Sequence, residues 1–216
     1  MTLSVKSRNH SSIFVVIAGP SASGKTTFIR QFKYKNRPYL AEDSLQALGL
    51  SPESRFRPMG ANSARKLIKR GEALLPTQNN RMIHLDLTSD SCGKHFKFCP
   101  IIFSHFKSVH SIQLYLPYQE WLRRIQRRHD LGRTVSECAQ QLFELSEVDD
   151  QRARRMYRNI YARWENYLDN KRIRSRIVID AQNDIIFRCH PKDVRRNLLR
   201  CVLSSTICRM PRLSSD

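Results

Sequence analysis

Long hydrophobic runs are missing from this 216-residue chain. The early apolar stretch 13–18 is far shorter than the roughly 20 residues that a helix needs to cross a bilayer, and no small-residue cleavage site follows it. We therefore expect no membrane span and no signal peptide, and we predict a cytoplasmic protein. Internal repeats and low-complexity linkers are also lacking. The length and the 40% hydrophobic content favour one domain over 13–203, with flexible tails at 1–12 and 204–216.

Acidic residues are scarce, because 19 Asp and Glu face 38 Lys and Arg, which gives a formal net charge of +19. A positive field of this size favours polyanionic partners such as nucleic acid, an anionic membrane surface or highly phosphorylated substrates. The aromatic residues are not interleaved with the basic ones in a recognisable RNA-binding pattern. Nucleic acid is therefore one partner that the charge would suit, and an ordinary basic surface is the alternative.

The six cysteines are scattered, so we expect reduced thiols and no disulfide framework. Cys92, His95, Cys99 and His105 lie close enough in sequence to suggest a zinc site, but their spacing matches no strong metal-binding pattern. An incidental group of partly buried side chains is the alternative.

Residues 19–26 read Gly-Pro-Ser-Ala-Ser-Gly-Lys-Thr, a complete G-x-x-x-x-G-K-[ST] pattern. The β-branched run 13–18 before it is typical of a buried strand, and the apolar spacing after it predicts a helix. Glycines allow the backbone to turn its amides toward phosphate oxygens, and the helix N-terminus adds positive charge. Lys25 would reach the β- and γ-phosphates, and the Thr26 hydroxyl would bind Mg²⁺. The predicted nucleotide contacts are Gly19, Ser21, Ala22, Ser23, Gly24, Lys25, Thr26 and Thr27.

Strand-like and helix-like segments alternate along the chain, which predicts an α/β fold with helices on both faces of a parallel sheet. Ligands of such sheets bind beyond the carboxyl ends of the strands. The long segment 134–170 can be divided in two at Asp149 and Asp150. The expected strands are 13–18, 38–41, 81–87, 109–116 and 176–180. The expected helices are 26–35, 61–75, 118–129, 134–170 and 192–203.

Two acidic residues follow expected strands. Asp43 comes after 38–41, where a carboxylate would face the terminal phosphate and orient or deprotonate an acceptor hydroxyl; a helix N-cap is its alternative role. Asp86 ends an apolar run in the manner of a Walker B acid, which binds Mg²⁺ directly or through water. Asp90 is a weaker second candidate, and loop capping is the alternative for both.

The segment 117–133 combines a helix that carries an arginine face with a glycine-containing turn and one more arginine. Arginines at this position can close over a triphosphate and neutralise charge in the transition state. We predict this role for Arg128 and Arg133, with Arg124 behind them. Trp121, Leu122 and Ile125 are expected to pack inward.

The order of these elements resembles that of small P-loop kinases of the zeta-toxin-like and chloramphenicol phosphotransferase-like group, which are close to polynucleotide kinase-like enzymes. The resemblance implies a three-layer P-loop fold with a mostly parallel five-stranded sheet in the order 2-3-1-4-5. It also implies that Asp43 acts on the acceptor hydroxyl and that Arg128, Arg133 and Arg155 hold phosphates. One departure is Asp86, which stands where the group has a threonine- or serine-rich strand end. The matching pieces are 19–26, 40–44, 64–68, 112–128, 132–133 and 154–157.

The sequence therefore predicts an enzyme that binds ATP with Mg²⁺ and transfers the γ-phosphoryl group to a hydroxyl of a small-molecule acceptor, which can itself be anionic. Two alternatives stay open. A polynucleotide 5′-hydroxyl kinase would use the same residues and would explain the charge. A non-kinase nucleotide-binding switch or assembly protein would bind nucleotide without phosphorylating an acceptor.

Overall fold

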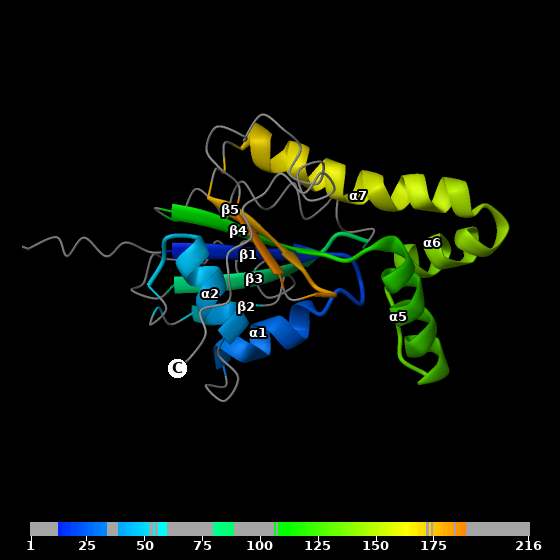
Figure 1. Cartoon of the computed structure of the whole chain (residues 1–216), viewed down its shortest axis with the longest axis horizontal. Coiled ribbons are helices and arrows are strands. Elements are labelled where there is room, and N and C mark those ends of the chain that lie inside the picture. Colours follow the sequence, from blue (N-terminus) through cyan, green and yellow to red (C-terminus); the bar gives the residue numbers. More distant parts are fainter. Residues whose placement is uncertain are drawn as a thin grey trace, which may run out of the picture.

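A six-stranded sheet lies at the centre of the structure, a computed structural model, in the order β2-β3-β1-β4-β5-β6. Strands β1 to β5 pair in parallel, and β6 pairs antiparallel with β5 at the edge (Figure 1). The strands are β1 Ile13–Gly19, β2 Phe56–Met59, β3 Asn80–Asp86, β4 Ser108–Tyr115, β5 Arg176–Asp180 and β6 Ile185–Arg188. The structure describes residues 13–33, 39–51, 54, 56–59, 80–88, 106, 108–171, 173, 175–183 and 185–188.

Helices cover both faces of this sheet. Helices α1 (Lys25–Lys33) and α2 (Tyr39–Ala47) pack on one face, and α5 (Tyr118–Asp130), α6 (Glu137–Val148) and α7 (Asp150–Asn170) pack on the other. Because successive side chains of a strand point to opposite faces, β1 supplies both cores. Val15 and Ile17 join the α1 side, and Phe14, Val16 and Ala18 join the α7 side. The predicted α/β arrangement is confirmed.

The break that the sequence suggests in 134–170 lies at Asp149, between α6 and α7. The Asp149 side chain accepts a hydrogen bond of 2.9 Å from the Arg152 N–H and so caps α7. Helix α7 then presents a row of large buried rings to the sheet, which includes Tyr157, Tyr161 and Trp164. This row fixes α7 along the upper face in Figure 1.

A buried ionic group fastens the end of α7 to the start of β5. Arg176 lies with its Nη1 3.3 Å from Glu165 Oε2 and donates from Nη2 to Asp169 Oδ1 at 2.5 Å. Arg176 and Glu165 are both almost fully buried. Burial raises the pKa of Glu165 to about 7. The charge of Arg176 lowers this pKa and that of Asp169 raises it, but each of these effects is smaller than that of burial. Arg176 therefore lies between two carboxyl groups, Glu165, which is buried, and Asp169, which is partly exposed.

The expected strand at 38–41 is wrong, because residues 39–47 form α2. Ser44, Leu45, Ala47 and Leu48 are buried, and their spacing is that of a helix face. The second strand is instead Phe56–Met59, at the sheet edge. Pro58 lies inside it, and an edge strand tolerates a proline because one side of the strand needs no ladder hydrogen bonds.

The order 2-3-1-4-5 is present among the parallel strands once β2 is placed at Phe56–Met59, and β6 adds a sixth strand that the sequence analysis did not expect. Asp180 closes the β5–β6 turn by accepting from the N–H groups of Gln182 and Asn183. The expected helices 61–75 and 192–203 and both tails lie outside the described residues. In the described part of the chain, no helix has the length and apolarity needed to cross a membrane.

Candidate active site

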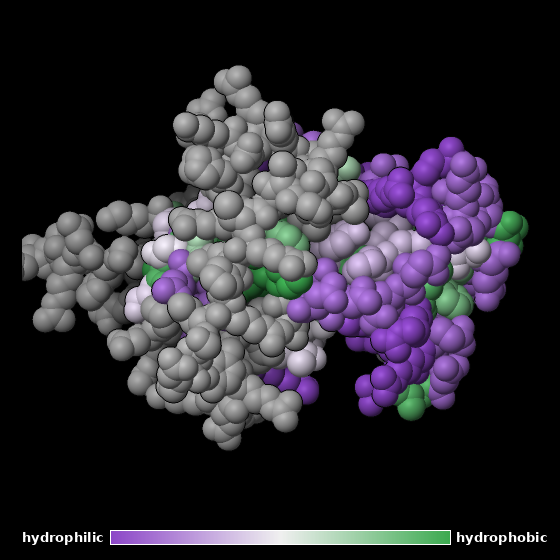
Figure 2. Space-filling model, in the orientation of Figure 1, coloured by the Kyte–Doolittle hydropathy of each residue, from purple (hydrophilic) through white to green (hydrophobic). Residues whose placement is uncertain are grey.

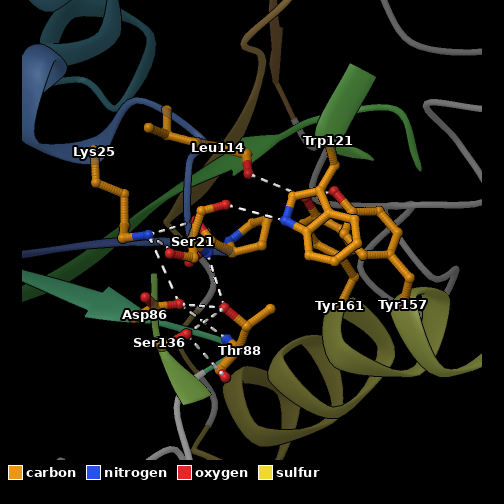
Figure 3. Close-up of polar contacts among 11 residues, drawn as sticks. Ser21, Lys25, Asp86, Thr88, Leu114, Trp121, Ser136, Tyr157 and Tyr161 are labelled. Carbon is orange, nitrogen blue, oxygen red and sulfur yellow. Dashed lines mark hydrogen bonds and ion pairs between the residues drawn. The ribbon is translucent and has the colours of Figure 1, made fainter. Parts of the chain in front are cut away.

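The 19–26 loop leaves the carboxyl end of β1, which is flanked by β3 and β4. Gly19 is paired with Asp86 at the end of β3, and the Leu87 N–H donates to the Gly19 carbonyl oxygen at 2.9 Å. In open α/β sheets, ligands bind at this edge. The loop therefore stands where the sequence predicts a site (Figure 3).

Position 19 leaves little room for a side chain. A Cβ there would lie 2.5 Å from Ser23 Oγ and 3.0 Å from the Leu114 carbonyl oxygen. The first contact would force the Ser23 side chain to move, and the contact with the Leu114 backbone is tighter than most real Cβ contacts. A glycine at this position avoids both contacts.

Two later loop residues have positive φ angles, Gly24 at 91° and Ala22 at 66°. Glycine adopts such angles freely. For an L-residue such as Ala22 the left-handed conformation costs of order 1–2 kcal/mol. Strain of this kind persists only where neighbouring contacts hold the backbone in place.

Those contacts are at Ser21, whose main chain is held from both sides. The Ser21 N–H donates to Thr88 Oγ1 at 2.9 Å, and the Ser21 carbonyl oxygen accepts from the Trp121 indole Nε1 at 3.1 Å. The Thr88 hydroxyl in turn donates to Asp86 Oδ1 at 2.7 Å. Residues from the ends of β1 and β3 and from α5 thus lock one loop conformation (Figure 3).

The Lys25 side chain folds back over the loop. Its Nζ donates to the carbonyl oxygens of Gly19 at 2.8 Å and Pro20 at 2.6 Å, and lies 4.0 Å from Asp86 Oδ1. Burial lowers the pKa of Lys25 from 10.5 to about 8; Asp86 raises it and Arg128 lowers it further. An ammonium group has three N–H donors, so one remains for a ligand.

Asp86 is the carboxylate that the structure places beside Lys25. Its Oδ1 accepts from the N–H and the hydroxyl of Thr88, and its side chain is 28% exposed. Thr26 and Thr27, at the start of α1, are exposed. A partly exposed carboxylate and an exposed hydroxyl are oxygen donors of the kind that Mg²⁺ uses together with phosphates and water.

A cavity of about 500 Å³ joins the loop to α5 and to the turn after it. The predicted residues Arg128 and Arg133 are both in its wall, together with three further arginines. Figure 2 shows that the surface over α5 and α7 is mostly hydrophilic. The lining residues are Ala22, Gly24, Thr27, Arg123, Arg124, Arg127, Arg128, Leu131 and Arg133.

The arginines of this wall fall into two groups. Arg123 and Arg124 are held by Glu120, whose oxygens lie 2.7 Å from each Nε. These hydrogen bonds lower the pKa of Glu120 to about 2. Arg127, Arg128 and Arg133 form no ion pair with any residue that the structure describes. Their charge is available to an anionic ligand.

Two predicted residues are not brought to this site. Asp43 lies within α2, which contacts α1 and β6 and sits toward the end of the sheet where the strands begin (Figure 1). Arg155 is exposed on α7. Neither lines the cavity. The argument that placed Asp43 after a second strand is therefore wrong.

The sequence analysis did not reveal the hydrogen bonds that Trp121 and Thr88 form with the 19–26 loop. It expected Trp121 to pack inward, as it does, but a sequence pattern does not show that its N–H meets the loop. Asp90 and the Cys/His group Cys92, His95, Cys99 and His105 lie outside the described residues. Among the residues described, no group of three His, Cys, Asp or Glu side chains is arranged to hold a metal ion by itself.

Comparison with known proteins does not assign the chain to a family. No protein-family model matches the chain, and no curated protein matches it in sequence. The resemblance to small P-loop kinases therefore stays a prediction, and the site itself carries the functional argument.

Proposed function

We propose that this chain is a P-loop kinase that binds ATP with Mg²⁺ at the 19–26 loop and transfers the γ-phosphoryl group to a hydroxyl of a small-molecule acceptor. The observation that carries the proposal is the cavity that the loop residues Ala22 and Gly24 and the adjoining Thr27 line together with Arg127, Arg128 and Arg133. Lys25, which lies 4.0 Å from Asp86, belongs to the same loop. The volume of about 500 Å³ is within the range of small-molecule pockets.

Each residue has a role that follows from its position. The loop amides and Lys25 bind the phosphates, because they gather donors and positive charge at the carboxyl end of β1. Thr26 and Asp86 would hold Mg²⁺, which neutralises phosphate charge when bound. Arg128 and Arg133 line the cavity together with Ala22 and Gly24 of the loop, and they would stabilise the charge that spreads over the phosphoryl oxygens during transfer.

The reaction asks little covalent chemistry of the protein. The acceptor hydroxyl oxygen forms a bond to the γ-phosphorus, the bond to the β,γ-bridging oxygen breaks, and the hydroxyl proton is released. The transition state of such transfers is loose, so catalysis consists mainly of positioning and charge neutralisation. The proposal assigns these functions to Lys25, Asp86 and the cavity arginines and assigns none to Asp43, which lies on α2 and does not line the cavity.

Transfer of label from γ-labelled ATP tests the proposal, with a pooled small-metabolite extract and 5′-hydroxyl oligonucleotides as separate acceptors. We expect label in a small molecule, its loss in Lys25→Ala, and no change in Lys171→Ala, which removes an exposed lysine at the end of α7. Label on the oligonucleotide instead would establish a polynucleotide kinase. Nucleotide binding that depends on Lys25, without any labelled acceptor, would replace the kinase with a switch or assembly protein.

A further inference from the structure

The Trp121 indole connects α5 to the 19–26 loop across 100 residues of sequence. Its Nε1 donates to the Ser21 carbonyl oxygen at 3.1 Å, and the side chain is fully buried. Figure 3 shows the ring between the loop and the side chains of Tyr157 and Tyr161. Most buried indole N–H groups have a hydrogen-bond acceptor, and here the acceptor belongs to the loop of the proposed active site.

This hydrogen bond fixes the direction of the next amide. The described chain has no cis peptide bond, and in a trans peptide the carbonyl oxygen and the following N–H point to opposite sides. Since the Ser21 oxygen faces the buried indole, the Ala22 N–H points away from it. Ala22 itself lines the cavity.

The orientation needs support because it is strained. Ala22 has a φ of 66°, which L-residues rarely adopt. Rotating the Ser21–Ala22 peptide by about half a turn would return φ to the negative region and would turn the Ala22 N–H toward the core. Such a rotation breaks the bond to Trp121. Thr88 holds the preceding N–H of Ser21, so the indole is the contact that opposes this particular rotation.

The indole can perform this task because its own place is fixed. Its ring centroid lies 5.0 Å from that of Tyr157, whose hydroxyl donates to the Leu116 carbonyl oxygen at 2.7 Å. Trp121 also lies on α5, the helix that brings Arg124 and Arg128 to the cavity wall. The loop conformation and the arginine wall are thus set by one helix.

We infer that Trp121 is a positioning residue of the phosphate site: its N–H holds the Ser21–Ala22 peptide so that the Ala22 N–H is directed at a bound phosphate. This inference rests on the proposed function, because it takes the bound anion to be the phosphates of ATP. Trp121 acts through the loop backbone and not on the reacting atoms.

The test separates the hydrogen bond from the packing of the ring. Trp121→Phe keeps an apolar ring without the donor, and replacement of Trp121 by benzothienylalanine keeps the size and shape of the indole with sulfur in place of N–H. Trp164→Phe is the matched control, since Trp164 is fully buried in the same core on α7. ATP affinity, thermal stability and the indole ¹H–¹⁵N signals are measured on the full chain.

We expect the benzothienylalanine protein to bind ATP about tenfold more weakly, the effect of one hydrogen bond of ordinary strength. Its loss of thermal stability should be no larger than that of Trp164→Phe. Trp164→Phe should lose stability but keep the affinity, and the Trp121 indole signal of the wild type should shift when ATP binds. If the benzothienylalanine protein bound ATP with wild-type affinity while Lys25→Ala lost ATP binding, the inference about Trp121 would be wrong and the proposed function would stand. Equal ATP binding by the wild type and Lys25→Ala, or none by either, would overturn the proposed function and the inference with it.

Discussion

Nζ of Lys25 lies 4.0 Å from Oδ1 of Asp86, so the loop after β1 and the end of β3 present opposite charges side by side. Lys25 is buried and donates to two loop carbonyls, and Asp86 is tied to Thr88. The pair therefore has a fixed geometry, and Lys25 belongs to the loop whose residues Ala22 and Gly24 line the arginine-rich cavity.

ATP affinity should fall as pH rises through about 8. Burial lowers the pKa of Lys25 to about 8, so the ammonium is charged below this pH and neutral above it. A neutral amine binds phosphate more weakly than an ammonium group does. Bound phosphate favours the charged form, so the pKa of Lys25 is higher in the complex than in the free protein. Calorimetric titrations from about pH 7 to about pH 10 measure the effect. An affinity of the wild type that does not change over this range would contradict the assigned role of Lys25.

Arg128→Gln and Arg133→Gln should each lower kcat/KM by about 10- to 100-fold, because each removes a charge-assisted hydrogen bond to phosphate. Arg123→Gln should have a smaller effect, since Arg123 is largely exposed and already paired with Glu120. Arg155→Gln is the matched control on α7. Steady-state kinetics of the four variants decide the point, and a loss in Arg155→Gln equal to that in Arg128→Gln would show that the cavity does not define the site.

Asp86→Asn should weaken Mg²⁺-dependent ATP binding and lower the transfer rate, because it removes the carboxylate beside Lys25 that would hold the metal. Asp43→Asn should leave both unchanged, because Asp43 lies within α2 and outside the cavity wall. Binding measured over a series of Mg²⁺ concentrations separates the two variants. Loss of transfer in Asp43→Asn with normal ATP binding would return the role of base to Asp43.

The free energy of unfolding should contain a contribution from Glu165 that falls as pH rises. The carboxyl group ionises near pH 4.5 in the unfolded chain and near pH 7 in the folded chain. The folded state thus holds the extra proton between these values, and stability is lost across this window, by up to about 3 kcal/mol. Urea unfolding of the wild type and Glu165→Gln at several pH values gives the difference. A decline that is equally steep in both proteins would show that Glu165 ionises normally.

Much of the sheet could be predicted because its strands carry strong local signals. The runs 13–18 and 176–180 are apolar and β-branched, and the structure places strands there at nearly the same bounds. β2 was missed because Pro58 argues against a strand unless the strand is known to be at an edge. Edge position is a property of the whole sheet and cannot be read from four residues.

The site was predicted in part for a similar reason. The 19–26 loop is a local motif. Arg128 lies on the helix that follows the recognisable strand β4, and Arg133 lies in the turn after that helix, so a position near the loop could be predicted for both. The position of Asp43 was predicted wrongly because the segment expected to be a strand before it belongs to helix α2, which also contains Asp43. The link from Trp121 to Ser21 joins residues 100 positions apart, and only the packing of α5 against the loop reveals it.

Calorimetric titration of the wild type, Lys25→Ala and Lys171→Ala with ATP in the presence of Mg²⁺ tests the central claim most directly. The account predicts saturable binding by the wild type and by Lys171→Ala, and loss of that binding in Lys25→Ala while the protein stays folded. Equal binding by Lys25→Ala, or none by the wild type, would contradict the assignment of the 19–26 loop and the arginine cavity as a nucleoside triphosphate site.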